Sequence, residues 1–352
     1  MGRRKYTLIG AALLVIVLLL WWAGIEDVLE ILETARPDYF LMAIVVYIAS
    51  LITWALRWRV LLKSLGVKAN FATILEGLLV GIFINNITPG ARGGGEPVRA
   101  YYIHKKTGDP YGPIFATVMI DRLTDVIPVM IMLILSTVYV YGLGSMTLMV
   151  TLLVLDAFFV GMTLVSAGII LSERKTKSIL YWLYRQFGRI MPKKAMNYEE
   201  KFVKTVEVSV PQFQDNLRIL LTHKKAFALS VSWSFITWTL IILRSYYIFY
   251  SINSPIRLLD IMVVQMVGIA VGMFAVVPGG AGLIAAVNSA VYVLLGINKE
   301  IAVTATLLER LISYWAPTII GAGLTTRFGA MVKKLKRKAG DNDINVEDEN
   351  KT

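Results

Sequence analysis

The sequence predicts an all-α polytopic membrane protein with about six full crossings and two re-entrant helical hairpins in an inverted repeat. The 352-residue chain is 56% hydrophobic, and its mean hydropathy is +0.64. A soluble domain would not carry so many long apolar runs, several of which reach the roughly 20 residues that span a bilayer. A pattern that occurs once in each half of the chain predicts the internal arrangement.

The repeated pattern is a Pro-Gly turn after an apolar run, followed by an acid-Arg-Leu triplet. The first turn reads Pro-Gly-Ala-Arg-Gly-Gly-Gly-Glu-Pro from Pro89, and the second reads Pro-Gly-Gly-Ala-Gly from Pro278. Asp121 follows the first proline by 32 residues, and Glu309 follows the second by 31. The tripeptide Ile-Thr-Trp also occurs twice, at 52–54 and 236–238. Duplicated apolar segments broken by glycine and proline are typical of transporter binding sites.

Six stretches are apolar enough for full crossings: 7–25, 39–62, 113–141, 146–171, 226–250 and 301–326. Two broken pairs of shorter limbs lie between them, at 73–88 with 97–106 and at 259–277 with 283–296. At ~1.5 Å per residue the first limb is about 24 Å long, which is shorter than the ~30 Å hydrocarbon core. We therefore expect each pair to enter and leave by one face, where protein or a wet cavity shields its backbone.

The distribution of charge predicts the topology. Three basic residues (3–5) precede the first apolar run, which we expect to stay uncleaved because it is long and no small-x-small signature follows it. The 173–225 connection holds twelve Lys or Arg against five Asp or Glu. The positive-inside rule then places both termini in the cytoplasm of a multi-pass cell-membrane protein. If each hairpin instead crossed the membrane twice, both termini would still lie on the same side. The charge distribution therefore does not distinguish re-entrant hairpins from pairs of full spans.

We expect one integral membrane domain at 1–330 and a charged cytoplasmic tail at 331–352. The repeat units, about 39–141 and 226–326, are separated by one extra crossing, so they insert with opposite orientation. The 173–225 linker interleaves aromatic and basic side chains, which suits helices on an anionic membrane surface; a solvated basic linker is the alternative. The acidic, polar composition after Gly340 predicts a disordered end.

The strongest candidate binding site surrounds the first Pro-Gly turn. Its residues are Asn86, Pro89, Arg92, Gly94, Gly95, Glu96 and Arg99. The glycines let backbone approach a ligand, and the N–H groups at the start of the returning helix attract anions. Arg92 and Arg99 add fixed charge and bidentate geometry for phosphate. The alternative is a tightly packed hairpin that needs glycine for helix contact.

The second turn repeats the glycines without the charges. Its candidate residues are Pro278, Gly279, Gly280 and Gly282. We assign them to the passage of lipid tails, or to a hinge and gate.

A second constellation consists of ionisable residues inside the predicted spans: Asp121, Arg122, Asp125, Glu309 and Arg310. Such groups are costly in lipid and usually face a bundle interior or a wet cavity. Asp121 and Asp125 share a helix face. Headgroup or proton handling is one interpretation, and charge neutralisation between helices is the other. We expect Arg57 to snorkel toward a helix end and Arg244 to pair.

Several classes of site are disfavoured by composition. Cysteine is absent and histidine occurs only twice, which excludes disulfides and cysteine metal sites and argues against a histidine metal centre. No Gly-rich phosphate loop with Lys-Ser/Thr occurs. The net charge of +12 lies mostly in connections and tails, so we expect no nucleic-acid partner. We expect no cofactor and no metal.

In the two Pro-Gly turns and the acid-Arg motifs, the chain resembles the flippase-like family that includes the transmembrane region of lysylphosphatidylglycerol synthase. This synthase is also called multiple peptide resistance factor. The resemblance covers most of 5–330. It rests on four motifs: Pro89 to Arg99, Asp121-Arg122 with Asp125, Pro278 to Gly282, and Glu309-Arg310 with Tyr314-Trp315. It implies a membrane protein that translocates a polar lipid between leaflets. In fused relatives a separate soluble domain makes the aminoacylated lipid, and we do not expect that synthesis here.

One departure from the family pattern matters. Relatives often place a glutamate soon after the second turn, where this chain reads Leu-Ile-Ala-Ala at 283–286. Any role for a carboxylate therefore moves to Glu96, Asp121 and Glu309.

The sequence predicts a transporter that moves a polar or anionic lipid, either a phospholipid or a polyprenyl-phosphate-linked lipid, between leaflets. No activated nucleophile is evident, so a transporter is favoured over an enzyme. Two alternatives stay open: an intramembrane lipid-modifying transferase with Glu96 or Asp121 as base, and a scaffold that recruits a lipid-synthesis enzyme through 173–225. The expected partners are the lipid substrate and the anionic membrane surface, and assembly into a homo-oligomer is left open.

Overall fold

The protein is an all-α membrane protein, as the sequence predicts. The computed structural model describes residues 17–88, 94–190, 192–274 and 281–349, and these residues contain no strand. After a short helix at 17–23, the elements are α2 (Ile25–Glu33), α3 (Pro37–Ser64), α4 (Phe71–Ile87), α5 (Gly95–Thr107), α6 (Tyr111–Gly142), α7 (Met146–Ile170), α8 (Glu173–Ile190), α9 (Pro192–Thr222), α10 (Lys224–Ser251), α11 (Leu258–Phe274), α12 (Ala281–Leu294), α13 (Lys299–Arg310), a π-helical turn (Leu311–Trp315) and α14 (Ala316–Glu349).

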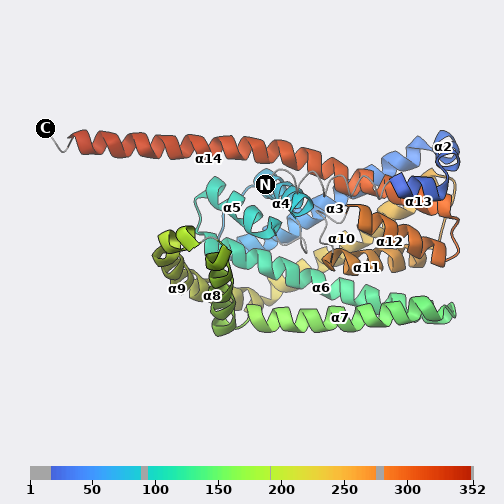
Figure 1. Ribbon diagram of the computed structural model, residues 1–352, viewed down its shortest axis with the longest axis horizontal. Coiled ribbons are helices and arrows are strands. Elements are labelled where there is room, and N and C mark those ends of the chain that lie inside the picture. The colour runs from blue at the N-terminus through green and yellow to red at the C-terminus, as the bar shows by residue number, and fades with distance from the viewer. Residues whose placement is uncertain (1–16, 89–93, 191, 275–280, 350–352) are drawn as a thin grey trace.

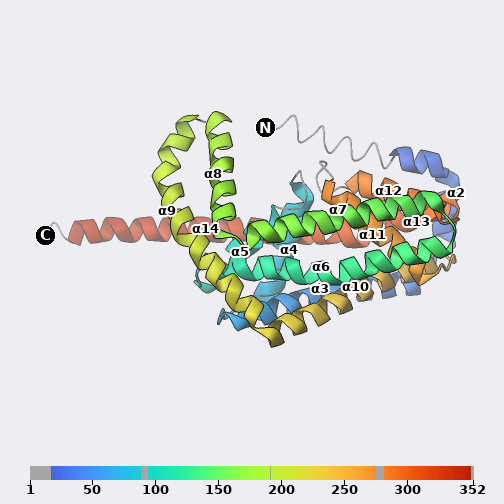
Figure 2. The ribbon, with the colours of Figure 1, turned by 90° about the horizontal axis from the view of Figure 1, so that it is seen from below.

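Four described helices are long and apolar enough to cross a membrane. They are α3, α6, α7 and α10, and they confirm the helices predicted at 39–62, 113–141, 146–171 and 226–250. Figures 1 and 2 show these helices running along the long axis of the molecule. Large apolar side chains are exposed on all four helices, among them Leu41, Ile134, Leu164 and Ile236, which suits contact with lipid.

The other two predicted crossings, 7–25 and 301–326, are not single uninterrupted α-helices in the structure. Of 7–25, only 17–23 is both described and helical, and the chain then turns at Gly24 into α2. The stretch 301–326 lies on α13, the π-helical turn and α14, which follow one another without a break. The total number of crossings stays a prediction.

The first helices of the two sequence repeats pack against each other. The backbone N–H of Arg36, before α3, donates to the carbonyl of Ser251, at the end of α10, over 2.6 Å, so the two helices run antiparallel. Thr53 and Thr237, the middle residues of the two Ile-Thr-Trp motifs, meet through a 2.8 Å hydrogen bond between their hydroxyls. Antiparallel packing of equivalent helices is what an inverted repeat requires; inversion of the whole repeat units stays a prediction.

The two broken pairs form short helices. α4 and α5 have 17 and 13 residues, and α11 and α12 have 17 and 14. At ~1.5 Å per residue they are about 20–26 Å long, below the ~30 Å of the hydrocarbon core. These lengths agree with re-entrant limbs, although entry and exit by one face stays a prediction. The turns at 89–93 and 275–280 lie outside the described residues.

The predicted linker is helical. α8 and α9 form a hairpin that projects sideways from one end of the long helices, and α8 lies across the direction of α7 (Figure 2). The hairpin is held by an ion pair from Lys177 to Glu207 at 2.5 Å and by the stacked rings of Tyr184 and Phe202. Its placement on an anionic membrane surface stays a prediction.

The end of the chain differs from the expected disordered segment. α14 continues past Gly340 to Glu349 and extends away from the other helices (Figure 1). The lysine-, alanine- and leucine-containing stretch before Gly340 favours helix, no proline interrupts it, and an existing helix extends at low cost per residue.

Candidate functional site

The start of α5 is held tightly against α4. A Cβ added to Gly95 would overlap the carbonyl oxygen of Gly81 on α4, so only glycine permits this approach. The side chain of Asn85 closes the hairpin: its Oδ1 accepts from the backbone N–H of Gly95 over 2.7 Å, and its Nδ2 donates to Glu96 Oε1 over 3.3 Å. α4 and the start of α5 are therefore in close contact at a glycine, as one interpretation of the hairpin expects, and Asn85 also holds Glu96, the first charged residue of α5.

Two charged side chains of α5 point toward α6. Glu96 Oε1 forms an ion pair with Arg122, and Arg99 Nη2 donates to Asp121 Oδ2 over 2.8 Å. Glu96 and Arg99 are only 7% and 2% exposed. They lie three residues apart and so share one face of α5. The adjacent acid and arginine of the Asp-Arg motif thus bind different partners, because neighbouring helical residues point in different directions.

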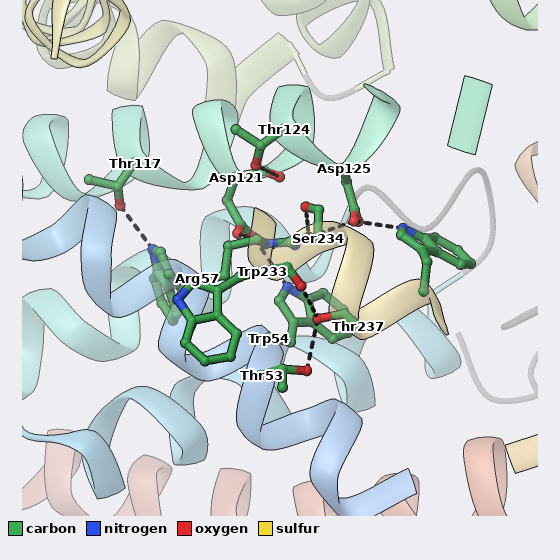
Figure 3. Close-up of polar contacts among 12 residues, drawn as sticks. Thr53, Trp54, Arg57, Thr117, Asp121, Thr124, Asp125, Trp233, Ser234 and Thr237 are labelled. Atoms are coloured by element: carbon green, nitrogen blue, oxygen red, sulfur yellow. Dashed lines mark hydrogen bonds and ion pairs between the residues drawn. The ribbon is translucent and has the colours of Figure 1, made fainter. Parts of the chain in front are cut away.

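Arg57 of α3 lies at the centre of this network. Its Nε donates to Asp121 Oδ1 over 2.6 Å, and its Nη1 donates to Asp125 Oδ1 over 2.5 Å and to Ser234 Oγ over 2.6 Å. Figure 3 shows these groups converging from α3, α6 and α10. The expectation that Arg57 snorkels is therefore wrong: its side chain is only 1% exposed, because three acceptors hold it inside the bundle.

Indole rings surround the charged groups. Trp54 Nε1 donates to Asp121 Oδ2 over 3.3 Å, and Trp238 Nε1 donates to Asp125 Oδ1 over 2.9 Å. The guanidinium of Arg99 lies 4.8 Å from the ring centroid of Trp58, within the range of a cation–π contact. The two tryptophans of the repeated Ile-Thr-Trp motifs therefore bind the two acids of α6.

Several polar atoms of this network have no partner. Within the described residues, Arg99 Nε and Nη1, Glu96 Oε2 and Arg57 Nη2 are buried and make no hydrogen bond. A buried unsatisfied group costs about 1–3 kcal/mol, and more when it is charged. Arg122 is the open side of the network, since its side chain is 38% exposed. With unsatisfied donors, one unsatisfied acceptor and an exposed side at Arg122, the network has the groups needed to bind a polar ligand.

The network is electrically balanced. It contains three arginines (Arg57, Arg99, Arg122) and three acids (Glu96, Asp121, Asp125). Balance is what burial in an apolar environment requires. The network therefore has no net positive charge, and its buried donors that make no hydrogen bond within the described residues are on Arg57 and Arg99.

The second half carries a separate and weaker cluster. Glu309 Oε2 lies 3.9 Å from Arg244 Nη2 and accepts from Gln265 Nε2 over 3.1 Å, and its Oε1 accepts from Tyr292 over 3.3 Å. The expectation that Arg244 pairs is confirmed. Arg310 instead stacks over the ring of Tyr314, 4.3 Å from its centroid.

The π-helical turn connects the second half to the first hairpin. It follows Arg310 directly and carries Tyr314, whose hydroxyl donates to the carbonyl of Asn86 over 3.3 Å. Asn86 Nδ2 in turn donates to Thr318 Oγ1 over 2.8 Å. Single π-helical turns occur frequently at functional sites, and this one binds the last turn of α4.

The structure brings together part of the predicted site. Six of the predicted residues lie together: Gly95, Glu96, Arg99, Asp121, Arg122 and Asp125. Gly94 lies against Thr88, Asn86 is bound to α14, and Gly282 is buried on α12. Glu309 and Arg310 do not join the network. The remaining predicted residues lie outside the described residues: Pro89, Arg92, Pro278, Gly279 and Gly280.

Sequence reasoning missed three participants: Trp54, Ser234 and Trp238. The duplicated Ile-Thr-Trp motif was a signal for the two tryptophans, because an indole N–H inside a membrane needs an acceptor. No pattern pointed to Ser234. The described residues also contain no group of three His, Asp or Glu side chains placed to hold a metal ion.

Comparison with known proteins agrees with this architecture. The family model described as the lysylphosphatidylglycerol synthase TM region matches residues 9–321. A UPF0104 membrane protein of Pyrococcus horikoshii is 36% identical over 325 residues, which cover 92% of this chain and 97% of the relative. A UPF0104 membrane protein of Methanothermobacter thermautotrophicus is 31% identical over 92% of this chain and 94% of its own.

A more distant relative carries an enzyme name. The glycosyltransferase AglD of Haloferax volcanii is 23% identical over 308 residues, which cover 80% of this chain and 47% of that protein. The family match covers most of the chain, and the described helices are apolar enough to cross a membrane. The chain belongs to the family of the lysylphosphatidylglycerol synthase transmembrane region and is a membrane protein.

Proposed function

We propose that this protein moves an anionic lipid between the leaflets of the cell membrane and binds the lipid phosphate through the Nε and Nη1 donors of Arg99. The observation that carries the proposal is that Arg99, a residue only 2% exposed, has two nitrogens, Nε and Nη1, that make no hydrogen bond within the part of the chain that the structure describes. Cδ lies between these two nitrogens on the planar guanidinium, so their N–H groups point in different directions and each could donate to a separate oxygen of the lipid headgroup. A bound phosphate would satisfy donors that otherwise stay buried without partners.

The position of the network supports transport rather than simple binding. Arg57 and Asp125 belong to the first half, and their partners Ser234 and Trp238 belong to α10 at the start of the second half. The π-helical turn likewise binds Asn86. Relative movement of the halves would therefore alter contacts within the network itself, which is what alternating access requires. In this proposal both termini face the cytoplasm.

The proposal is tested by lipid translocation in vesicles with a tail-labelled phosphatidylglycerol. Arg99→Ala removes a charged hydrogen-bonding group worth about 1.5–3 kcal/mol, so we expect the rate to fall about 10- to 100-fold. Glu96→Gln should also slow transport, because Arg122 loses its charged partner. Arg36→Ala is the matched control, since the Arg36 side chain is exposed and contacts Asp38 at 3.0 Å and the ring of Tyr39 at 4.3 Å from its centroid, both outside the network. Unchanged rates in both site variants, with folded protein by size-exclusion chromatography, would remove the proposed site.

A second candidate function is intramembrane lipid modification. Two observations favour this candidate. One relative is named as a glycosyltransferase, and Glu96 Oε2, which makes no hydrogen bond within the described residues, could act as a base. Mass spectrometry of labelled lipid after transport separates the two, because a transporter leaves its substrate chemically unaltered.

A further inference from the structure

We propose that α8 is an interfacial helix that anchors the α8–α9 hairpin to anionic lipids of the membrane surface. In this arrangement Trp182 and Leu183 insert between lipid molecules, and arginines along the helix bind headgroup phosphates. The surface lies outside the charged network of α3, α5 and α6, and the proposal does not depend on lipid transport.

The first argument is the direction of α8. The candidate span α7 ends at Ile170, and α8 begins at Glu173. Because α8 lies across the direction of α7 (Figure 2), a membrane that α7 spans has α8 parallel to its surface. Lys175 Nζ lies 3.9 Å from the position of a Cβ added to Gly168 in the last turn of α7. The first turn of α8 is therefore held at the level where α7 leaves the lipid.

The second argument starts from the side of α8 that contacts α9. Lys177 forms an ion pair with Glu207 at 2.5 Å, and the hydroxyl of Tyr181 donates to the same carboxylate over 2.8 Å. The ring of Tyr184 stacks on that of Phe202 with centroids 4.0 Å apart. Since the three residues of α8 are spaced at i, i+4 and i+7, they lie on one face. That face is covered by α9.

The opposite side of α8 is apolar and exposed. At 3.6 residues per turn, Trp182 and Leu183 point away from the face that contacts α9, and they are 53% and 50% exposed. Along the long axis of the molecule, α8 lies nearer to the spanning helices than the first part of α9 does (Figures 1 and 2). The side of α8 opposite α9 therefore faces the membrane. Tryptophan is enriched at this level of a bilayer, since its ring is apolar and its N–H binds polar groups.

The third argument is charge. α8 has five basic residues against one acid, whereas α9 has five against four. Within the described residues, the ion pairs of α8 are those of Lys177. Arg174, Arg185 and Arg189 are exposed, and their spacing from Trp182 places them along its side of the helix. A helix with an apolar side flanked by basic residues is typical of attachment to an anionic membrane surface.

The proposal is tested on the full-length protein in lipid nanodiscs, where both faces of the bilayer are accessible. The chain has no cysteine, so Leu183→Cys places a single nitroxide label on α8. Its depth is measured by collisions with oxygen, which concentrates in lipid, and with a water-soluble nickel complex. Tyr198→Cys is the control, because Tyr198 is 58% exposed on the first part of α9.

We expect phosphatidylglycerol in the nanodiscs to protect the label on α8 from nickel, compared with phosphatidylcholine alone. Each arginine near an anionic surface shifts the ratio of docked to free helix by about fivefold, so the three arginines together should shift it by on the order of 100-fold. Combining Arg174→Gln, Arg185→Gln and Arg189→Gln should remove the difference between the two lipids. The label at position 198 should stay accessible to nickel in both.

Three results would overturn the proposal. The first is a label on α8 that is as accessible to nickel as the control label in both lipids. The second is equal protection with and without phosphatidylglycerol, since lipid charge would then have no part in docking. The third is protection together with spin–spin broadening that disappears when unlabelled protein is added, which would assign this side of α8 to a second copy of the chain.

Discussion

The two halves of the chain share a helical plan but differ in the charge that they bury. In the first half, Arg57, Arg99 and Asp121 meet through contacts of 2.6–2.8 Å. In the second half, Glu309 lies 3.9 Å from Arg244 and is otherwise bound by neutral groups. When Gly95 is aligned with Gly282, Glu96 corresponds to Leu283 and Arg99 corresponds to Ala286. The second pair of short helices therefore forms without charges at these two positions.

Among variants that compare the two halves, Asp121→Ala should cause the largest loss of stability. The change removes the shared acceptor of Arg57 and Arg99 and leaves two buried cations without it. Removing one partner of a buried ion pair costs about 3–5 kcal/mol. We expect a marked loss of thermal stability in detergent, measured by the unfolding midpoint. Stability equal to that of the unaltered protein would show that the network does not hold the first half together.

A smaller effect is expected from the equivalent change in the second half, Glu309→Ala. Arg244 is then left without its acid, but the pair is already 3.9 Å apart and Gln265 and Tyr292 keep other neighbours. We expect a loss of stability about half that of Asp121→Ala, since hydrogen bonds to a charged group are worth about 1.5–3 kcal/mol. A larger loss than that of Asp121→Ala would reverse our assignment of the tight network to the first half.

Alanine substitutions compare the packing of the two hairpins. In Gly95→Ala the added Cβ meets the backbone carbonyl of Gly81, which cannot move without shifting α4. In Gly268→Ala it meets the side chain of Asn288, which can rotate. Overpacking typically costs about 1–3 kcal/mol, and we expect Gly95→Ala at the upper end and Gly268→Ala at the lower. Equal unfolding midpoints for the two variants would contradict the close approach of α4 and α5.

The smallest effect concerns the α8–α9 hairpin that joins the halves. Hydrogen bonds from Lys177 and Tyr181 hold the pKa of Glu207 below its usual value. A carboxyl group with a lowered pKa stabilises the folded hairpin at pH above its unfolded pKa of about 4.3. That contribution disappears as the pH falls through the lower folded pKa. Spin labels on α8 and α9, in a chain that has no native cysteine, should therefore move apart only under strongly acidic conditions.

The matched variant for this prediction is Glu207→Gln. It removes the titrating group and should abolish the pH dependence of the distance between the labels. The same pH dependence in both proteins would show that another group controls the hairpin.

The sequence predicts the helices better than the contacts between them. Length and apolarity are enough to find α3, α6, α7 and α10, because a membrane allows few alternatives to helix. The duplicated turns and the Asp-Arg motif point to Glu96, Arg99 and Asp121. Local patterns cannot show that Arg57 reaches Asp125 or that Ser234 completes its contacts, since these residues are far apart in sequence and meet only after packing.

The second half shows the limit of reasoning from repetition. The sequence gives Glu309 and Arg310 the same form as Asp121 and Arg122, which suggests equal roles. In the structure Glu309 has Gln265 and Tyr292 as partners in place of a second arginine. The motif repeats, but its neighbours on α11 and α12 do not carry matching charges, and those neighbours determine what the acid can bind.

The account is tested most directly by lipid translocation with arginine-to-lysine changes in the two halves. Arg99→Lys keeps the charge beside Asp121 but removes Nε and Nη1, which make no hydrogen bond within the described residues, and Arg244→Lys replaces the guanidinium beside Glu309. We predict that Arg99→Lys slows movement of phosphatidylglycerol by about tenfold or more, which corresponds to about 1.4 kcal/mol, and that Arg244→Lys has a clearly smaller effect. A loss in Arg244→Lys as large as that in Arg99→Lys, with both proteins folded, would contradict the assignment of the phosphate site to the first hairpin.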